Sequence, residues 1–246
     1  MPKLSVIITA FDKHNVTVAH FRECMKASRL PDEIIIVNDN GDPCLKEMLE
    51  KVPRKCPLIY SRINEDIMWN YNGAYNLGIW LSSGDYLMFE DNDNIPMKDT
   101  YKEMLEKMES RPDVGKLIAY GRAEIEQQDL DKPSEEWVER GKRGPNMGTH
   151  MIRRDIILKI KGQDERMCGR YGWMYYDYKS RLVKAGTLIE NASTYWYVRD
   201  AQSNLDRHMS SANFKLYRQN ARLNRIQPPE GILNFTYATE YYNISV

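Results

Sequence analysis

Strand patterns and helix patterns alternate along about the first 120 residues, and this alternation constrains the fold more than any other feature. Residues 4–10 and 33–37 are nearly continuous β-branched runs, a pattern typical of strands covered on both faces. The expected elements are strands at 4–10, 33–37, 58–63, 86–89 and 114–120, and helices at 18–25, 42–52, 69–81 and 97–108. This order predicts an α/β fold with a mainly parallel sheet and helices on both faces.

One apolar run, Tyr86 to Phe89, ends abruptly in the sequence Glu-Asp-Asn-Asp-Asn. A strand that ends in Asp-x-Asp places Asp91 and Asp93 on the same side of the pleat, where the chain leaves the sheet. Two hard oxygen donors held in this way suit Mg²⁺ or Mn²⁺, which proteins bind through one or two carboxylates plus a substrate's phosphates. The alternative is a solvated turn, because Asp and Asn are common in turns in any case.

Polar residues follow two other predicted strands as well. Phe11 and Asp12 come after the first strand, and Asp39 comes after the second. In parallel sheets, ligands bind beyond the carboxyl ends of the strands. We therefore expect these residues to converge with Asp91 and Asp93 in one site.

The second half of the chain has a different character. Residues 123–148 are rich in charge, Gly and Pro, and carry one Trp, Trp137, which we expect to be exposed. Such a segment is either a flexible loop over the site or an ordinary surface excursion. Further elements are expected in this order: a strand at 149–152, helices at 154–161 and 173–184, strands at 187–189 and 194–198, a polar helical segment within 202–225 and a strand-like segment within 231–242.

Composition and charge exclude several classes of protein. Thirty-five Lys and Arg balance 35 Asp and Glu, so no basic field favours nucleic acid. There is no signal-peptide pattern and no apolar stretch of about 18 residues, so we expect neither secretion nor a transmembrane segment. The four cysteines lack Cys-x-x-Cys spacing, which fits free thiols in a reducing compartment. We expect a cytoplasmic enzyme, with peripheral membrane contact through residues 141–143 or the aromatic tail left open.

Five blocks of sequence, taken in order, resemble the family 2 inverting nucleotide-sugar glycosyltransferases. They are residues 4–12, residues 32–42, residues 73–78 with 83–93 (the run into a DXD motif), residues 148–165 and residues 176–186. The resemblance implies the GT-A fold, a Rossmann-like, mainly parallel sheet flanked by helices with a small C-terminal extension. It also implies one glycosyltransferase domain at 1–200, with a nucleotide-sugar half at 1–120 and an acceptor half at 121–200, and an extension at 201–246 packed on that domain.

The resemblance also assigns residues to the nucleotide and the metal. Those implied to bind the nucleotide are Ala10, Phe11, Asp12, Asp39, Asn76 and Asp91. Asp91 would face the ribose and the metal, and Asp93 would ligate the Mn²⁺ or Mg²⁺ ion that bridges the diphosphate. The chemistry fits, because attack on the anomeric carbon leaves a diphosphate whose developing charge needs a metal clamp.

The catalytic base is where this sequence departs from the family pattern. Inversion needs a carboxylate that takes the acceptor's proton. The family has Glu-Asp-x-Asp before an Arg-Leu pair, but this chain has Met174 and Tyr175 at the Glu-Asp positions, and only Asp177 matches. Asp177 is therefore the candidate base. A gap in the alignment and a base supplied differently stay open, as does a plain helix-surface ion pair with Arg181 at i+4.

Four further residues are candidates with smaller roles. Asp164 and Glu165, just before the same segment, are the fallback for the base. The family often has a His near the end of the domain as a metal or phosphate contact; here Asp200 stands at that position, and His208 is close enough to replace it. Both are candidate metal ligands.

Together these inferences predict a metal-dependent inverting glycosyltransferase. It would move a sugar from a nucleotide diphosphate donor, with a UDP-sugar favoured, to a glycan or lipid-linked glycan acceptor. A non-catalytic nucleotide-sugar-binding protein of the same fold is the alternative from another class. A nucleotidyltransferase is a further alternative, but it would normally have a Gly-rich basic loop after the first strand, which residues 9–14 lack. No nucleic-acid partner is expected.

Overall fold

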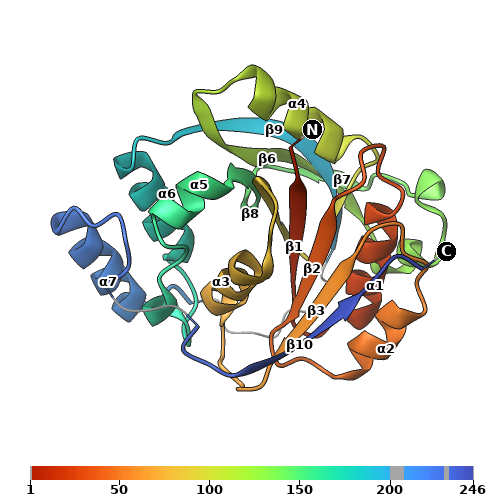
Figure 1. The fold of residues 1–246 in the computed structure, drawn as a ribbon, viewed down its shortest axis with the longest axis horizontal. Coiled ribbons are helices and arrows are strands. Elements are labelled where there is room, and N and C mark those ends of the chain that lie inside the picture. Colours follow the sequence, from red (N-terminus) through yellow and green to blue (C-terminus); the bar gives the residue numbers. More distant parts are fainter. Residues whose placement is uncertain (1, 200–207, 230–232, 246) are drawn as a thin grey trace.

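The computed structural model describes residues 2–199, 208–229 and 233–245, and its centre is one mixed sheet of ten strands (Figure 1). The strands are β1 (Leu4–Ala10), β2 (Glu33–Asn38), β3 (Leu58–Ile63), β4 (Tyr86–Asp91), β5 (Asn94–Pro96), β6 (Val114–Ile125), β7 (Gly141–Arg143), β8 (Asn146–Arg153), β9 (Leu188–Val198) and β10 (Tyr237–Tyr242). Their order across the sheet is β10-β3-β2-β1-β4-β8-β6-β9-β5, with β7 paired to β6.

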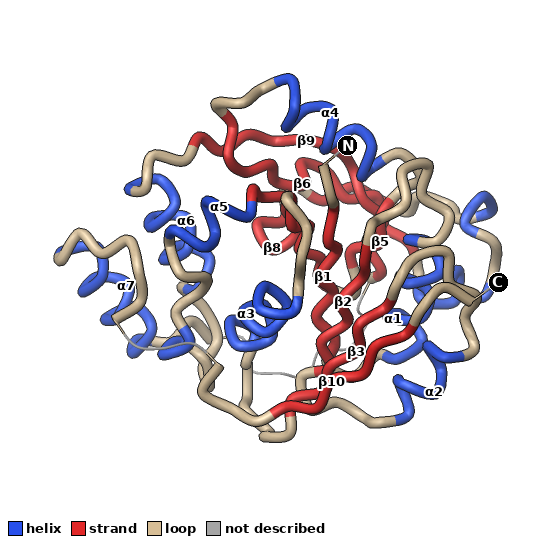
Figure 2. Tube along the Cα trace, viewed as in Figure 1, coloured by secondary structure: helices blue, strands red, loops and turns tan. Residues whose placement is uncertain are grey.

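Helices cover both faces of the sheet (Figure 2). They are α1 (His14–Cys24), α2 (Cys44–Glu50), α3 (Tyr71–Leu81), α4 (Thr100–Ser110), α5 (Arg154–Lys159), α6 (Met174–Lys184) and α7 (Ser211–Arg222). Alternate residues of β1 face the two layers: Val6 and Ile8 pack in the cluster that contains α1, α2 and α4, whereas Ile7 packs in the cluster that contains α3, α5 and α6. This is why residues 6–8 of β1 and 34–37 of β2 are continuously apolar.

The first half of the sheet is parallel, as the alternation of elements predicts. β1 pairs in parallel with both β2 and β4, and β2 pairs in parallel with β3. Ile7 in the central strand lies opposite Ile35 on one side and Phe89 on the other. The carboxyl ends of these strands therefore meet at one edge of the sheet.

The second half of the sheet is mixed. β8 runs antiparallel to both β4 and β6, and β9 runs parallel to β6 along nearly its whole length. The two short strands expected at 187–189 and 194–198 are one continuous strand, β9. The polar residues between them interrupt the apolar pattern, but pairing with the long strand β6 continues across Ala192 and Thr194.

The charged segment after β6 is more ordered than its composition indicates. β6 extends to Ile125, two 3₁₀ helices follow (Gln127–Asp131 and Ser134–Glu136), and β7 pairs back onto β6. The expectation that Trp137 is exposed is wrong: its side chain is buried and packs with Leu130 and Trp196. Its indole N–H donates to the Lys132 carbonyl, so both its apolar and its polar parts are satisfied.

The residues after the gap at 200–207 form two further elements. Helix α7 lies beside α6 at the left edge of Figure 1. Strand β10 pairs antiparallel with β3 and so becomes the outermost strand of that side of the sheet. The helical character and the strand pattern expected in these two segments are both present.

Candidate active site

The turns after β1 and β2 lie against each other at the carboxyl edge of the sheet. The Asp39 backbone N–H donates to the Ala10 carbonyl at 2.8 Å. Asp12 and Lys13 both have positive φ angles, 51° and 54°, in the left-handed region that such residues seldom adopt. Strained backbone of this kind concentrates at ligand-binding sites. Phe11 is 45% exposed at this edge, whereas Ala10 is buried.

Asp39 lies just below this surface. The Asn70 amide, at the start of α3, donates to one Asp39 oxygen at 2.9 Å. Partial burial raises the pKa of Asp39 to about 7, although the hydrogen bond from Asn70 acts in the opposite direction. Asp39 therefore changes charge near neutral pH, in a position where a ribose or base could donate to it.

Asp91, the last residue of β4, is surrounded by hydrogen-bond donors. The Tyr75 hydroxyl donates to one of its oxygens and the Asn146 amide to the other, each at 3.0 Å. Burial raises the pKa of Asp91, and burial together with the charge of Asp91 raises the pKa of Tyr75 and Tyr175 well above the usual value. Both phenols therefore stay protonated, and that of Tyr75 donates to Asp91.

Gly148 of β8 brings its backbone close to this group. A Cβ atom at this position would lie 2.7 Å from an Asp91 oxygen and 2.5 Å from the Tyr175 hydroxyl. The hydroxyl of Tyr71 would lie 2.9 Å away, and the Tyr71 ring lies edge-on to that of Tyr175 with centroids 5.2 Å apart. Only glycine fits this approach without displacing the groups around Asp91.

Asp93, two residues after Asp91, is held by neighbouring side chains and by the end of β9. The Asn94 amide donates to one Asp93 oxygen at 2.7 Å, and Lys13 Nζ lies 3.9 Å from the other. The backbone N–H of Val198, at the end of β9, donates to the Asp93 carbonyl. The Asn94 Oδ1 atom is buried and accepts no hydrogen bond from the described residues. Carboxylate and amide oxygens at one turn are the donor set that Mg²⁺ and Mn²⁺ prefer.

Two arginines that the sequence interpretation missed approach the same turn. Arg122 of β6 and Arg143 of β7 lie over the ring of Tyr197, at 4.9 and 4.7 Å from its centroid. Burial, and then the charge of Asp93, raise the pKa of Tyr197, so this residue lies within electrostatic range of the acidic turn. Arg143 also pairs with Glu124. Sequence position gave no signal, because the pairing of β6 with β7 and β9 is what brings these side chains to the site.

A buried histidine ties α1 to the acidic turn. His20 Nδ1 lies 3.0 Å from the carbonyl of Asn92, the residue between the two aspartates, and donates to it because a carbonyl can only accept. His20 Nε2 lies 2.7 Å from a Glu90 oxygen, which also accepts from the Tyr101 hydroxyl. The Asn92 amide donates to Thr17, also on α1. The turn is thus held from below by side chains that solvent does not reach.

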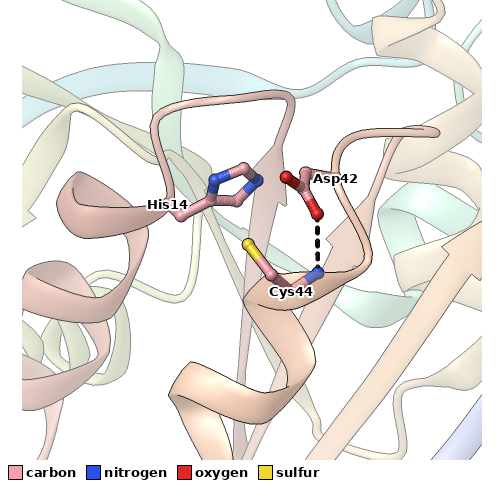
Figure 3. A group of neighbouring side chains, drawn as sticks. All are labelled: His14, Asp42 and Cys44. Carbon is pink, nitrogen blue, oxygen red and sulfur yellow. Dashed lines mark hydrogen bonds between the residues drawn. The ribbon is translucent and has the colours of Figure 1, made fainter.

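Two groups of three potential metal-ligating side chains occur among the described residues, and neither contains Asp91 or Asp93. One is His20, Cys24 and Glu90, which belong to the buried contacts just described. The other is His14, Asp42 and Cys44, at the ends of the turns after β1 and β2 (Figure 3). There Asp42 accepts the Cys44 backbone N–H at 2.8 Å, which lowers the Asp42 pKa and satisfies a donor at the start of α2.

Asp177, the candidate base, is not placed to accept a proton from a substrate. It is buried, with Arg181 Nε donating to one oxygen at 2.7 Å and the Asn220 amide donating to the other at 2.8 Å. Arg181 in turn donates to the carbonyls of Ile160 and Gly162. This is the ion pair with Arg181 that was the alternative interpretation, in a buried rather than an exposed setting.

Asn76 is also occupied by the protein itself. It is fully buried; its amide nitrogen donates to the Gln163 carbonyl and to Glu165, and its oxygen accepts the Gln163 N–H. This does not favour the predicted nucleotide contact, since no surface of Asn76 is open to a ligand. The fallback bases are engaged too: Asp164 pairs with Arg166 at 2.5 Å, and Glu165 accepts the backbone N–H of Leu233 at 2.8 Å.

The two further metal candidates lie at the gap in the described chain. Asp200 falls outside the described residues. His208 is the first residue after the gap, and its side chain is exposed. Asp91 and Asp93 therefore remain the predicted metal ligands. Basic side chains that could contact phosphates, Lys13, Arg122 and Arg143, lie near them.

The fold and the order of these elements are those of the GT-A glycosyltransferases. Residues 5–175, well over half of the chain, match the family model "Glycosyl transferase family 2". The chain belongs to glycosyltransferase family 2. This confirms both the predicted family and the predicted fold class.

Solved structures with a similar fold include a mannosyltransferase, PcManGT, from Pyrobaculum calidifontis in complex with GDP-Man and Mn²⁺. The TM-score is 0.60 at 11% identity, covering 90% of this chain and 62% of that one. The structure of S. aureus TarS 1–349 gives a TM-score of 0.63 at 13% identity, covering 80% of this chain and 60% of that one.

Curated relatives match over shorter stretches. A Campylobacter jejuni GalNAc(5)-diNAcBac-PP-undecaprenol beta-1,3-glucosyltransferase is 24% identical over 107 residues, which are 44% of this chain and 35% of that protein. An uncharacterized glycosyltransferase of Rickettsia bellii is 25% identical over 124 residues, 50% of this chain and 18% of that protein. The chain thus spans about a third or less of these relatives. None of the helices in the described ranges is long and apolar enough to cross a membrane.

The close approach at Gly148 predicts a selective loss of binding in Gly148→Ala. The new methyl group displaces Tyr175 or Asp91, so we expect at least a tenfold loss of affinity for a Mn²⁺–nucleotide complex, measured by calorimetry. The matched control is Gly144→Ala, where a Cβ meets nothing within 4 Å and both affinity and stability stay close to wild type. Equal affinities in the two variants would contradict the assignment of this region to the site.

The buried ion pair predicts that Asp177→Asn is chiefly a stability variant. Removing one partner leaves Arg181 charged and uncompensated, which costs about 3–5 kcal/mol of unfolding free energy. Denaturant titration measures this, with Glu139→Gln as control, because the exposed pair of Glu139 with Lys142 is worth about 1 kcal/mol or less. A variant that unfolds like wild type but loses all turnover would restore Asp177 as the base.

Proposed function

We propose that this protein transfers a sugar from a nucleotide diphosphate donor with the help of Mn²⁺ or Mg²⁺. The observation that carries the proposal is the charge arrangement at the end of β4. Asp91 and Asp93 lie at one turn, and Lys13, Arg122 and Arg143 approach it from three other elements. A divalent cation with a diphosphate carries both signs of charge, so it matches carboxylates flanked by cations.

Each part of the donor has a counterpart in this arrangement. Asp91 and Asp93 would hold the metal, which stabilises the negative charge that develops on the leaving diphosphate. The cationic side chains would contact the phosphates, Phe11 would stack on the base, and Asp39 would accept from the base or ribose. The mannosyltransferase of similar fold was solved in complex with GDP-Man and Mn²⁺, which supports a nucleotide-sugar donor and a divalent cation.

The donor and the acceptor are the finer parts of the proposal. We propose a UDP-sugar as the donor, transferred with inversion as the family resemblance implies. We propose a glycan or lipid-linked glycan as the acceptor. The Campylobacter relative supports a lipid-linked acceptor, because its name describes an undecaprenol-linked substrate.

A second candidate function is that of a non-catalytic nucleotide-sugar-binding protein. The residues at the expected position of the catalytic base favour it. Tyr175 stands at the position where the family has the second carboxylate, and its raised pKa keeps the phenol protonated, so it does not take up a proton as a carboxylate base would. Both oxygens of Asp177 accept hydrogen bonds from the protein. Both candidate functions require binding of the nucleotide-sugar donor. Only a transferase would release free nucleotide diphosphate when an acceptor is added, so this release distinguishes the two.

The decisive experiment is thermal unfolding with UDP, GDP, CDP or dTDP, each with Mn²⁺ and then with excess EDTA. We expect one nucleotide to stabilise the protein, by about 2.7 kcal/mol at a hundredfold excess over its dissociation constant. EDTA and the variant Asp93→Asn should both abolish the shift. The control Asp113→Asn removes a surface carboxylate paired with Arg111 and should leave the shift intact. Absence of a shift with every nucleotide would overturn the proposal.

The raised pKa of Asp39 predicts a pH dependence of nucleotide binding. Burial raises the pKa to about 7, so the carboxyl is protonated below this value and ionised above it. Hydroxyl or N–H donors on the nucleotide favour the ionised form, so affinity should increase as the pH rises from about 6 to about 8. Asp39→Asn should flatten this part of the profile. An unchanged profile in that variant would show that another group titrates.

A further inference from the structure

The two fully buried side chains of helix α7 are amides, and Leu216 and Tyr217 are half-buried beside them. Asn213 is buried, and its amide donates to the carbonyls of Met167, Arg170 and Gly172. Asn220, two turns further along, is buried too and donates to Asp164 and to Asp177. These contacts hold α7 against α6 and the segment before it by hydrogen bonds.

The outward half of α7 is a mixture of apolar and basic side chains. Phe214 is 37% exposed and Leu223 is 48% exposed. The exposed side chains on this half, in order, are Phe214, Lys215, Arg218, Gln219, Arg222 and Leu223. An ordinary surface helix of a globular protein has a polar outward face, so the exposure of Phe214 and Leu223 departs from that pattern. This half of α7, together with Met209 at 47% exposed just before it, is called the outer face below.

The charge of this segment is one-sided, although the chain as a whole is neutral. Residues 208–225 contain Lys215, Arg218, Arg222 and Arg225 and no Asp or Glu. The Arg218 guanidinium lies 5.7 Å from the centre of the Phe214 ring, so the cations are interleaved with the apolar side chains. The segment is therefore a local basic surface on a balanced protein.

Aromatic rings of α6 extend the outer face. Trp173, just before α6, has its ring centroid 4.5 Å from that of Phe214 and 5.6 Å from that of Tyr217. Tyr176, one turn into α6, is 52% exposed and lies 5.3 Å from Trp173. Amphipathic aromatic rings beside Lys and Arg are typical of surfaces that lie at the boundary between water and lipid.

We propose that the outer face of α7 seats the protein on an anionic lipid bilayer. Cations attract the negatively charged headgroups, and Met209, Phe214 and Leu223 enter the boundary with the acyl chains. The role of this membrane contact rests on the proposed function, whereas the contact itself does not. Helix α6 packs on α7 and carries Tyr175, which lies close to Asp91. A bilayer at α7 would therefore bring a membrane-embedded acceptor near the site.

Vesicle sedimentation of the full chain tests this proposal directly. We expect the protein to bind vesicles of phosphatidylcholine mixed with phosphatidylglycerol, not vesicles of phosphatidylcholine alone, and to be released by high salt. K215E/R218E/R222E should lower the bound fraction at least tenfold, and F214S/L223S should lower it as well. The matched control K51E/K55E/K102E makes the same change of charge at three exposed lysines elsewhere and should bind like wild type.

Nucleotide binding with Mn²⁺ is measured on the same variants. It should be unchanged in all of them, so a loss of vesicle binding is separable from a failure of the active-site proposal. Equal vesicle binding by wild type and K215E/R218E/R222E would overturn the proposal, as would absence of binding by wild type. A lipid-free dimer that F214S/L223S dissociates in analytical ultracentrifugation would assign the outer face to a second copy of this chain and overturn it too.

Discussion

The contact between Glu90 and His20 joins the core of the protein to its acidic turn. It lies near the end of strand β4, where burial excludes water from both side chains. Hydrogen bonds compensate a buried carboxylate for its lost hydration, and His20 and Tyr101 both contact one Glu90 oxygen, Oε2. Because His20 also holds the Asn92 carbonyl, the same contact that satisfies the core fixes the backbone between Asp91 and Asp93. The packing of α1 on the sheet and the backbone geometry of the turn therefore depend on the same side chain, His20.

A second polar cluster organises the opposite side of the molecule. Asp177, Arg181 and Asn220 form a buried set that joins α6 to α7, and Asp164 joins it through Asn220. Such a cluster is favourable only when every member has its partners. Here the partners come from segments far apart in the chain, so the attachment of α7 depends on the correct fold of α6. The ring contacts of Trp173 with Phe214 and Tyr217 add apolar packing to this attachment.

The sequence predicts most of the architecture because parallel strands and their helices leave local patterns. The strand ends at Asp12, Asp39 and Asp91 follow from those patterns and from the rule on ligand position. Other features depend on pairings that local patterns do not encode. Arg122 and Arg143 reach the site through antiparallel pairing of β6 with β7, and the second partner of Asp177, Asn220, lies 43 residues away on α7. The burial of Trp137 was not predicted because its neighbours in sequence are polar, whereas the apolar residues that it packs against are brought to it by the fold.

Strand β10 has a consequence for how the protein is made. It covers β3, whose backbone would otherwise present unpaired N–H and C=O groups at the border of the sheet. On the ribosome, β3 emerges long before β10, so this border stays bare until synthesis has reached residue 242. During that interval the nascent chain offers the β3 edge as a template for strand addition by other chains, and pairing with β10 then covers that edge.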